Sequence, residues 1–157
     1  MIQILFVSLG CDKNLVDSEV MLGLLEEKGY AITNEEKEAD VVVVNTCCFI
    51  GDAKEESIDD IIEMGKLKET GKLKALIVTG CLAQRYKDEI QAELPEVDAI
   101  VGTTATEAIV DAVEEALKGK GYTHFEDINY LPPSHAKRVI TSGTYMGYLK
   151  IAEGCDK

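Results

Sequence analysis

The chain has 157 residues, of which 46% are hydrophobic and 29% are charged. This balance is ordinary for a soluble globular protein and excludes collagen-like, disulfide-dense and intrinsically disordered classes. The length predicts one domain with room for an appendage. Sixteen basic and twenty-nine acidic residues give a net charge of −13. Because such a charge repels phosphate backbones, we expect no direct binding to nucleic acid.

The apolar runs are short. None approaches the roughly 20 residues of a membrane-spanning helix, and the first five residues lack the basic start of a signal peptide. We therefore expect a cytoplasmic protein without membrane contact. The five cysteines are widely spaced, and the cytosol is reducing, so a disulfide framework is not expected.

Apolar runs alternate with amphipathic stretches over the first 120 residues. Strands are predicted at 2–8, 30–33, 39–46, 75–79 and 98–101. Strands that alternate with helices form right-handed βαβ units. The expected fold class is therefore α/β: a doubly wound, Rossmann- or flavodoxin-like parallel sheet of about five strands with helices on both faces.

The intervening helices are indicated by apolar residues at helical spacing. These are Val20, Met21, Leu24 and Leu25 in the first helix, Ile58, Ile61 and Ile62 in the second, Tyr86, Ile90 and Leu94 in the third, and Ile109, Val110, Val113 and Leu117 in the fourth. Gly29, Pro95 and Gly119 are predicted to end the first, third and fourth helices. Thr104 and Glu107 match a capping box before the fourth helix.

The remaining residues have a different character. Residues 121–143 contain two consecutive prolines and little periodicity, so we interpret them as a linker after a domain that covers residues 1–120. Strand character resumes over 144–152, just before the sequence stops at Lys157. We expect residues 144–157 to be the truncated start of a second domain.

Four cysteines directly follow predicted strands: Cys11, Cys47, Cys48 and Cys81. In open α/β sheets, ligands bind outside the carboxyl ends of the strands, where the strand order reverses. If the strand order is 2-1-3-4-5, the strands that lead to Cys11, Cys47 and Cys81 are neighbours, about 4.8 Å apart. Their three thiolates would then be within reach of one ligand.

Clustered thiolates suit zinc or an iron–sulfur cluster. Structural zinc usually takes four ligands in close Cys-x-x-Cys pairs, which this chain lacks. Three separated cysteines instead suit a four-iron four-sulfur cluster with one iron open. Three alternatives stay open at this point: cysteines as buried small hydrophobes, a zinc-stabilised interaction domain, and a non-catalytic flavodoxin-like redox or binding module.

Polar residues accompany the three cysteines. Asn14, Asn45, Thr46 and Gln84 are candidates to orient a bound cofactor through hydrogen bonds. Cys48 is adjacent to Cys47, and neighbouring strand residues point to opposite faces. We therefore expect Cys48 to be packed rather than to serve as a ligand.

Three sequence motifs carry a family resemblance. Residues 8–19 (SLGCDKNLVDSE), 45–47 (NTC) and 80–84 (GCLAQ) resemble the three cysteine motifs of the methylthiotransferases, which are radical S-adenosylmethionine enzymes. Residues 49–58 and 148–155 most resemble the ribosomal-protein aspartate methylthiotransferases, the RimO family. The tRNA-modifying relatives, which remain the alternative, typically carry Gln-Met where this chain has Asp12 and Lys13.

The resemblance implies two four-iron four-sulfur clusters and S-adenosylmethionine as cofactors. Cys11, Cys47 and Cys81 would hold the auxiliary cluster that presents a sulfur. Cys155 would be the first of three ligands of the radical-generating cluster, whose other two ligands are not in this sequence. No catalytic residue is assigned within the chain.

The implied reaction adds a methylthio group to the β-carbon of an aspartate in a small-subunit ribosomal protein. The radical S-adenosylmethionine barrel and the family's C-terminal domain are not in this sequence. We therefore expect the 157-residue chain to be inactive by itself.

Overall fold

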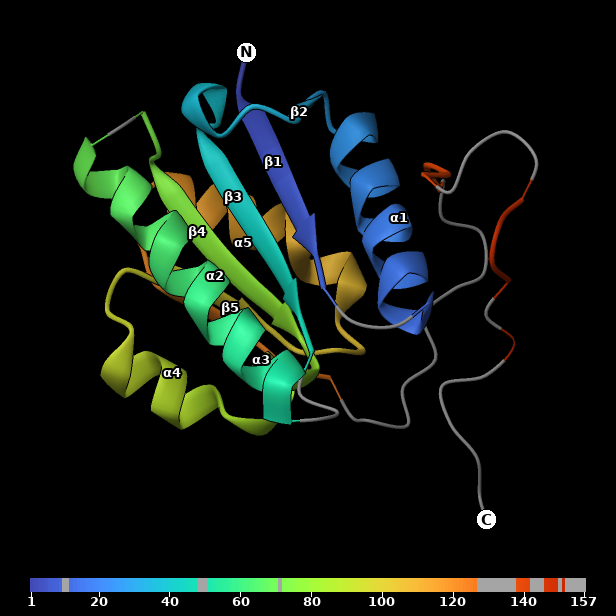
Figure 1. Ribbon diagram of the computed structural model, residues 1–157. Coiled ribbons are helices and arrows are strands. Elements are labelled where there is room, and N and C mark those ends of the chain that lie inside the picture. Colours follow the sequence, from blue (N-terminus) through green and yellow to red (C-terminus); the bar gives the residue numbers. More distant parts are fainter. Residues whose placement is uncertain are drawn as a thin grey trace.

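The computed structural model describes residues 1–9, 12–47, 51–70, 72–126, 138–141, 146–149 and 151 (Figure 1). Its strands are β1 (Gln3–Ser8), β2 (Ala31–Thr33), β3 (Val41–Thr46), β4 (Ala75–Gly80), β5 (Ala99–Val101) and β6 (Tyr122–His124). They form one sheet in the order β2-β1-β3-β4-β5-β6, and every pair is parallel. The predicted doubly wound α/β fold is confirmed, with six strands in place of about five.

The helices are α1 (Asp12–Glu27), α2 (Gly51–Thr70), α3 (Cys81–Arg85), α4 (Lys87–Glu93) and α5 (Ile109–Leu117), with short 3₁₀ turns η1 (Glu36–Glu38) and η2 (Thr106–Ala108). Side chains of α1 and α5 pack in one core cluster, and side chains of α2, α3 and α4 pack in another. The sheet separates the two clusters (Figure 1). Helices therefore cover both faces, as predicted.

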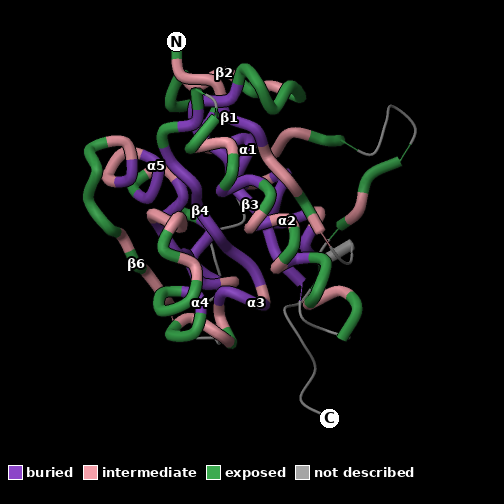
Figure 2. Tube along the Cα trace, turned by 60° about the vertical axis from the view of Figure 1, so that its left-hand side comes forward, coloured by how far each residue is buried: buried purple, intermediate pink, exposed green. Residues whose placement is uncertain are grey.

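Strand β3 shows why the sheet is buried on both sides. Val41 and Val43 belong to the cluster with α1 and α5, whereas Val42 and Val44 belong to the cluster with α2. All four valines are fully buried, and Figure 2 shows the central strands as the most buried part of the trace. Because alternate side chains point to opposite faces, a strand in this position must be apolar throughout.

Strand β6 corrects the predicted linker. It lies within 121–143, yet Tyr122 pairs with Ala99 and His124 with Val101 at the edge of the sheet. Gly119, whose φ is +76°, ends the preceding helix as predicted, and Tyr122 packs against the core of that face. Edge pairing and one partly buried ring stabilise a strand that is too short to show periodicity.

The rest of the predicted linker and the predicted strand at 144–152 are described only in part. Residues 127–137 of the predicted linker lie outside the described residues. Within the predicted strand at 144–152, residues 146–149 and 151 are described and have no regular secondary structure. A strand needs a neighbouring strand for its backbone hydrogen bonds, and none of the described strands pairs with this segment.

Two helix predictions are corrected. The predicted third helix is divided at Tyr86, whose φ and ψ of −120° and 33° are not helical, into α3 and α4. The capping box is wrong, because Ala105 precedes η2 and no side chain caps either η2 or α5. The first turn is instead a 3₁₀ turn, in which backbone bonds replace a side-chain cap.

The amino-terminal edge of the sheet is held by Asp40, which is 2% exposed. Its Oδ2 accepts a hydrogen bond from the backbone of Gln3 at 2.9 Å, and the ammonium groups of Lys72 and Lys74 lie 3.6 and 3.2 Å from its carboxylate oxygens. Burial alone would raise the pKa of Asp40, but the Gln3 hydrogen bond and the two lysines hold it below its ordinary value. Asp40 thereby connects β1 to the start of β4.

We expect Asp40→Asn to lower the free energy of unfolding by about 1–3 kcal/mol near neutral pH, because a charge-assisted hydrogen bond and two ion pairs are lost. The native pKa of Asp40 is lowered, so its contribution is complete above about pH 4 and is lost as the pH falls through the native pKa. Urea titrations at several pH values would measure this. The exposed Asp59→Asn on α2 is the control, and equal losses in both variants would contradict the argument.

Candidate metal centre

Cys47 and Cys81 leave the sheet side by side. In the pairing of β3 with β4, Thr46 is opposite Gly80, and each cysteine comes one residue later. Neither cysteine is in a disulfide bond, and Cys47 is buried whereas Cys81 is partly exposed. The structure therefore brings two of the three predicted ligands to the carboxyl edge of neighbouring strands.

Cys11, Cys48 and Cys155 lie outside the described residues. The strand that leads to Cys11 is nonetheless described, and β1 is adjacent to β3 as the prediction requires. The backbone NH of Leu9 donates to the carbonyl of Asn45 at 3.0 Å and so continues this pairing toward Cys11. The described part of the chain, which does not include Cys11, contains no group of three His, Cys, Asp or Glu side chains placed to hold a metal ion.

Asn14 connects three strand ends. It is 1% exposed, and its Nδ2 donates to the carbonyl oxygens of Leu9, after β1, at 3.0 Å and of Thr46, at the end of β3, at 2.8 Å. These two bonds fix the amide so that Oδ1 accepts from the Cys81 thiol, 3.9 Å away. Asn14 thus contacts a predicted ligand, and a metal bound at Cys81 would displace the thiol proton that this contact holds.

Asn45 and Thr46 support the backbone at the same edge. Asn45 Nδ2 donates to the carbonyl of Asn14 at 2.9 Å and to Ser18 Oγ at 2.8 Å, and Ser18 Oγ donates to Ser8 Oγ. Thr46 Oγ1 donates to the carbonyl of Thr79 at 2.6 Å. Asn45 thereby attaches α1 to β3, and Thr46 attaches β3 to β4.

Gln84 acts further along the edge. Its Oε1 accepts a hydrogen bond from the backbone NH of Thr103 at 3.1 Å. Thr103 belongs to the loop after β5, so Gln84 connects α3 to that loop. Any role of Gln84 toward a cofactor remains a prediction.

Sequence reasoning missed Ser57. It is fully buried on α2, its Oγ accepts from the backbone NH of Cys47 at 3.0 Å, and its hydroxyl donates to the carbonyl of Cys47 at 3.0 Å. A small polar residue four positions before the buried Ile61, on the apolar side of the helix, was the available signal. Ser57 holds the backbone of Cys47 against α2.

Gly80 determines how the chain turns into Cys81. Its φ of +94° and ψ of −164° fall in a region that essentially only glycine adopts. A Cβ at this position would collide with Asn45 Oδ1 and lie 2.5 Å from the carbonyl oxygen of Thr46. The close approach of β4 to β3 at the cysteine edge therefore requires glycine.

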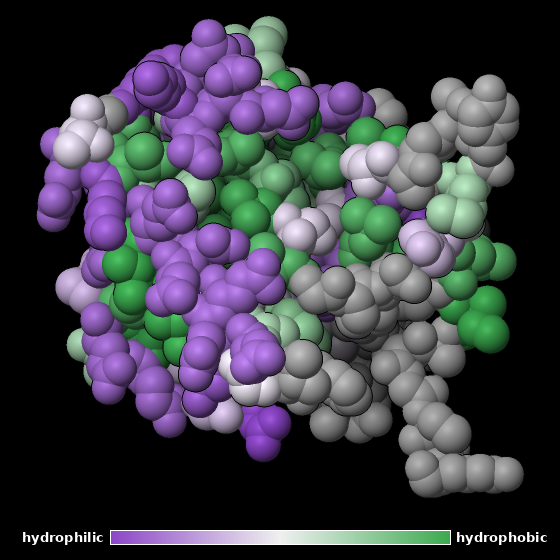
Figure 3. Space-filling view, viewed as in Figure 1, coloured by the Kyte–Doolittle hydropathy of each residue, from purple (hydrophilic) through white to green (hydrophobic). Residues whose placement is uncertain are grey.

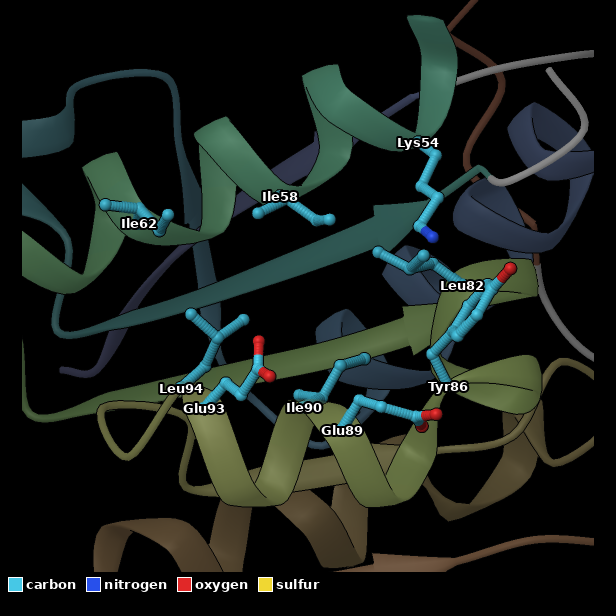
Figure 4. Close-up of a pocket in the computed structure, with 9 residues that line it drawn as sticks. All are labelled: Lys54, Ile58, Ile62, Leu82, Tyr86, Glu89, Ile90, Glu93 and Leu94. Carbon is cyan, nitrogen blue, oxygen red and sulfur yellow. The ribbon is translucent and has the colours of Figure 1, made fainter. Parts of the chain in front are cut away.

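An apolar groove of about 530 Å³ runs between α2 and α4 and is lined by Lys54, Ile58, Ile62, Leu82, Tyr86, Glu89, Ile90, Glu93 and Leu94. Figure 3 shows hydrophobic residues between hydrophilic ones on this face, and Figure 4 shows the α2 isoleucines facing the apolar side chains of α4. We call the carboxyl edge of β3 and β4, from which Cys47 and Cys81 leave the sheet, the thiol edge. No residue that lines the groove is a cysteine or histidine, so the thiol edge, and not this groove, is the candidate metal centre.

We expect Gly80→Ala to lower the free energy of unfolding by at least about 3 kcal/mol, because both the backbone strain and the collision must be relieved. Gly29→Ala is the control, since Gly29 also has a positive φ of +98° but a Cβ there would meet nothing within 4 Å. Its cost should be about 1 kcal/mol. Chemical denaturation of both variants measures the difference, and equal costs would show that the contact with β3 is unimportant.

None of the helices in the described ranges is long and apolar enough to cross a membrane.

Comparison with known proteins reveals close relatives. Proteins named ribosomal protein uS12 methylthiotransferase RimO from Lachnoclostridium phytofermentans, Desulforamulus reducens and Clostridioides difficile are 60%, 56% and 50% identical to this chain. The alignments cover 99%, 96% and 99% of the chain, but only 35%, 34% and 35% of the relatives. The chain thus spans about a third of the length of the curated relatives it matches.

A family model also matches directly. The model described as "Uncharacterized protein family UPF0004" matches residues 3–102, which include the three cysteine motifs and the strands β1 to β5. This match, together with the relatives, confirms the resemblance that the motifs indicated. The chain belongs to the UPF0004 family and corresponds to the N-terminal part of its RimO relatives.

Proposed function

We propose that this chain is the part of a ribosomal-protein methylthiotransferase that binds an auxiliary four-iron four-sulfur cluster through Cys11, Cys47 and Cys81. The observation that carries the proposal is the register of β3 and β4, which gives Cys47 and Cys81, neither of them in a disulfide, equivalent positions at one sheet edge. The position of β1 next to β3 supports the third ligand. Soft thiolates at a strand-order switch point are the donors that an iron–sulfur cluster requires.

The surroundings suit such a group. When bound, the cluster would supply an iron atom that holds a sulfur for transfer. The chain's own residues would then hold the ligands in place: Ser57 fixes the backbone of Cys47, Gly80 directs the turn into Cys81, and Asn14 connects the neighbouring strand ends. A site held by the sheet before the cofactor binds loses little conformational freedom on binding.

After anaerobic reconstitution with iron and sulfide, we expect the chain to show the broad visible absorbance of an iron–sulfur cluster. Cys11→Ala, Cys47→Ala and Cys81→Ala should each lose most of the bound iron, because each removes a ligand. Cys48→Ala is the matched control and should retain it. Iron and sulfide content per chain measure the effect, and circular dichroism verifies folding.

Other outcomes would select other functions. Iron loss from Cys48→Ala equal to that from Cys47→Ala would mean that the wrong member of the pair has been assigned. Paired flavin absorbance peaks would favour a flavodoxin-like module, and bound zinc without visible absorbance would favour a zinc-stabilised interaction domain.

For the whole protein, we propose that an aspartate of ribosomal protein uS12 receives a methylthio group at its β-carbon. The relatives' name specifies uS12, and the net charge of −13 suits a basic protein better than RNA. S-adenosylmethionine and a second cluster, whose first ligand would be Cys155, belong to the same proposal. So do a radical S-adenosylmethionine domain that begins in 144–157 and a cytoplasmic location.

The complete protein, incubated anaerobically with uS12, S-adenosylmethionine and a reductant, should add one methylthio group to uS12, detected by mass spectrometry. Unmodified tRNA is the competing substrate, and modification of tRNA instead would overturn the assignment. The 157-residue chain alone should not cleave S-adenosylmethionine, because only one of the three implied ligands of the radical cluster is in it. Cleavage by this chain would contradict the division of roles.

A further inference from the structure

A buried carboxylate on α1 binds a segment far away in the sequence. Glu19 is fully buried, and its Oε2 accepts from Arg138 Nε at 2.6 Å and lies 2.5 Å from Arg138 Nη2. Its Oε1 accepts from the backbone NH of Thr141 at 2.8 Å and from Thr141 Oγ1 at 2.9 Å. The backbone NH of Val139 donates to the carbonyl of Glu19 at 3.1 Å. Residues 138–141 are therefore attached to one residue of α1 by both main chain and side chains.

The attachment compensates a buried charge. A buried charge is costly unless it is paired and hydrogen-bonded. Burial would raise the pKa of Glu19, but the bonds from Thr141 and Arg138 hold it below its ordinary value, so the carboxylate stays charged. The partners that the structure gives this carboxylate come from residues 138–141. Without them, α1 would contain an uncompensated charge.

The attachment of residues 138–141 to Glu19 lies beside the thiol edge. Ser18, the residue before Glu19, contacts Ser8 at the end of β1 and Asn45 of β3, both at 2.8 Å. Consecutive Cα atoms are about 3.8 Å apart, so residues 138–141 are attached one residue from a side chain that holds this edge. The described C-terminal segments, red in Figure 1, lie on the α1 side of the molecule. Cys155 follows Thr141 by fourteen positions.

A purely stabilising role explains this arrangement poorly. Well-packed apolar residues are often as stabilising as a buried ion pair, or more so, because two charges need not be removed from water. A buried ion pair does specify which segments meet, since a slipped arrangement leaves a charge unpaired. The ion pair therefore suits a connection that must keep one position. We call the contacts of Glu19 with residues 138–141 the joint.

We propose that Glu19 is a positioning residue that fixes residues 138–141 against α1, so that the segment leading to Cys155 starts from a defined point beside the thiol edge. This inference rests on the proposed function, in which that segment leads to the radical-generating half. Transfer between two centres requires the reacting atoms to be held in a near-attack arrangement. A connection that moved freely would hold them there only part of the time.

The joint itself is tested in the 157-residue chain by hydrogen exchange of residues 138–141. In Glu19→Gln, exchange at Thr141 should accelerate roughly tenfold or more, because its NH loses a hydrogen bond to a charged group. Exchange at Val139, whose NH donates to the main-chain carbonyl of Glu19, should accelerate with it because the segment is less firmly held. Arg138→Gln, outside the sheet and helices, should do the same even if the first variant folds poorly. Glu27→Gln, an exposed glutamate on the same helix, is the control and should change nothing. Unchanged exchange in both joint variants would overturn the proposal.

The positioning role is tested in the complete protein. Glu19→Gln and Arg138→Gln should keep wild-type cluster content and S-adenosylmethionine cleavage, while methylthio transfer to uS12 per cleavage falls at least about tenfold. Arg138→Lys should recover part of the transfer, because it restores the charge without the guanidinium geometry. Unchanged transfer per cleavage would overturn the inference. Failure of the wild-type protein to transfer at all would refute the proposed function instead, and the exchange result would still decide whether the joint exists.

Discussion

Parallel pairing of β1, β3 and β4 is the constraint on which the thiol edge depends. Because every strand in the sheet runs in one direction, all carboxyl ends meet at one edge, and the register decides which residues leave the sheet at the same level. Thr46 opposite Gly80 is the pair that matters, since each precedes a cysteine. A slip of one residue would move a cysteine out of line and turn the buried valines of β3 toward the wrong face.

The register is itself secured by apolar burial and by polar contacts at the edge. Four fully buried valines in β3 are covered by both helix layers, so we expect the sheet to form without any contribution from a metal. At the edge, Asn14 and Ser57 then fill the backbone hydrogen-bonding positions that the strands leave as they end. We therefore expect this edge to be formed before any cofactor binds, unlike the sites of small domains that fold around zinc.

Two buried carboxylates illustrate different uses of charge. Asp40 is paired by Lys72 and Lys74 and by the start of β1, all within the sheet's amino-terminal edge, so its role is local. Glu19 is paired by Arg138 and Thr141, more than one hundred positions away. The same electrostatic requirement, that a buried charge needs a partner, holds one edge of the sheet together in the first case and attaches a distant segment in the second.

The sequence by itself determined the strand–helix alternation, the parallel sheet and the strand ends that carry Cys47 and Cys81. The reason is that apolar periodicity and glycines are local features of the chain, and they indicate which residues are buried and where elements end. It also singled out Asn14 as a candidate to orient a cofactor, and the structure places Asn14 Oδ1 3.9 Å from the Cys81 thiol. It did not reveal β6, the break at Tyr86, the role of Ser57 or the distant partner of Glu19. These depend on which edge is open for pairing and which distant side chain reaches a buried polar group. Such contacts join residues far apart in the chain, so only the tertiary structure decides them.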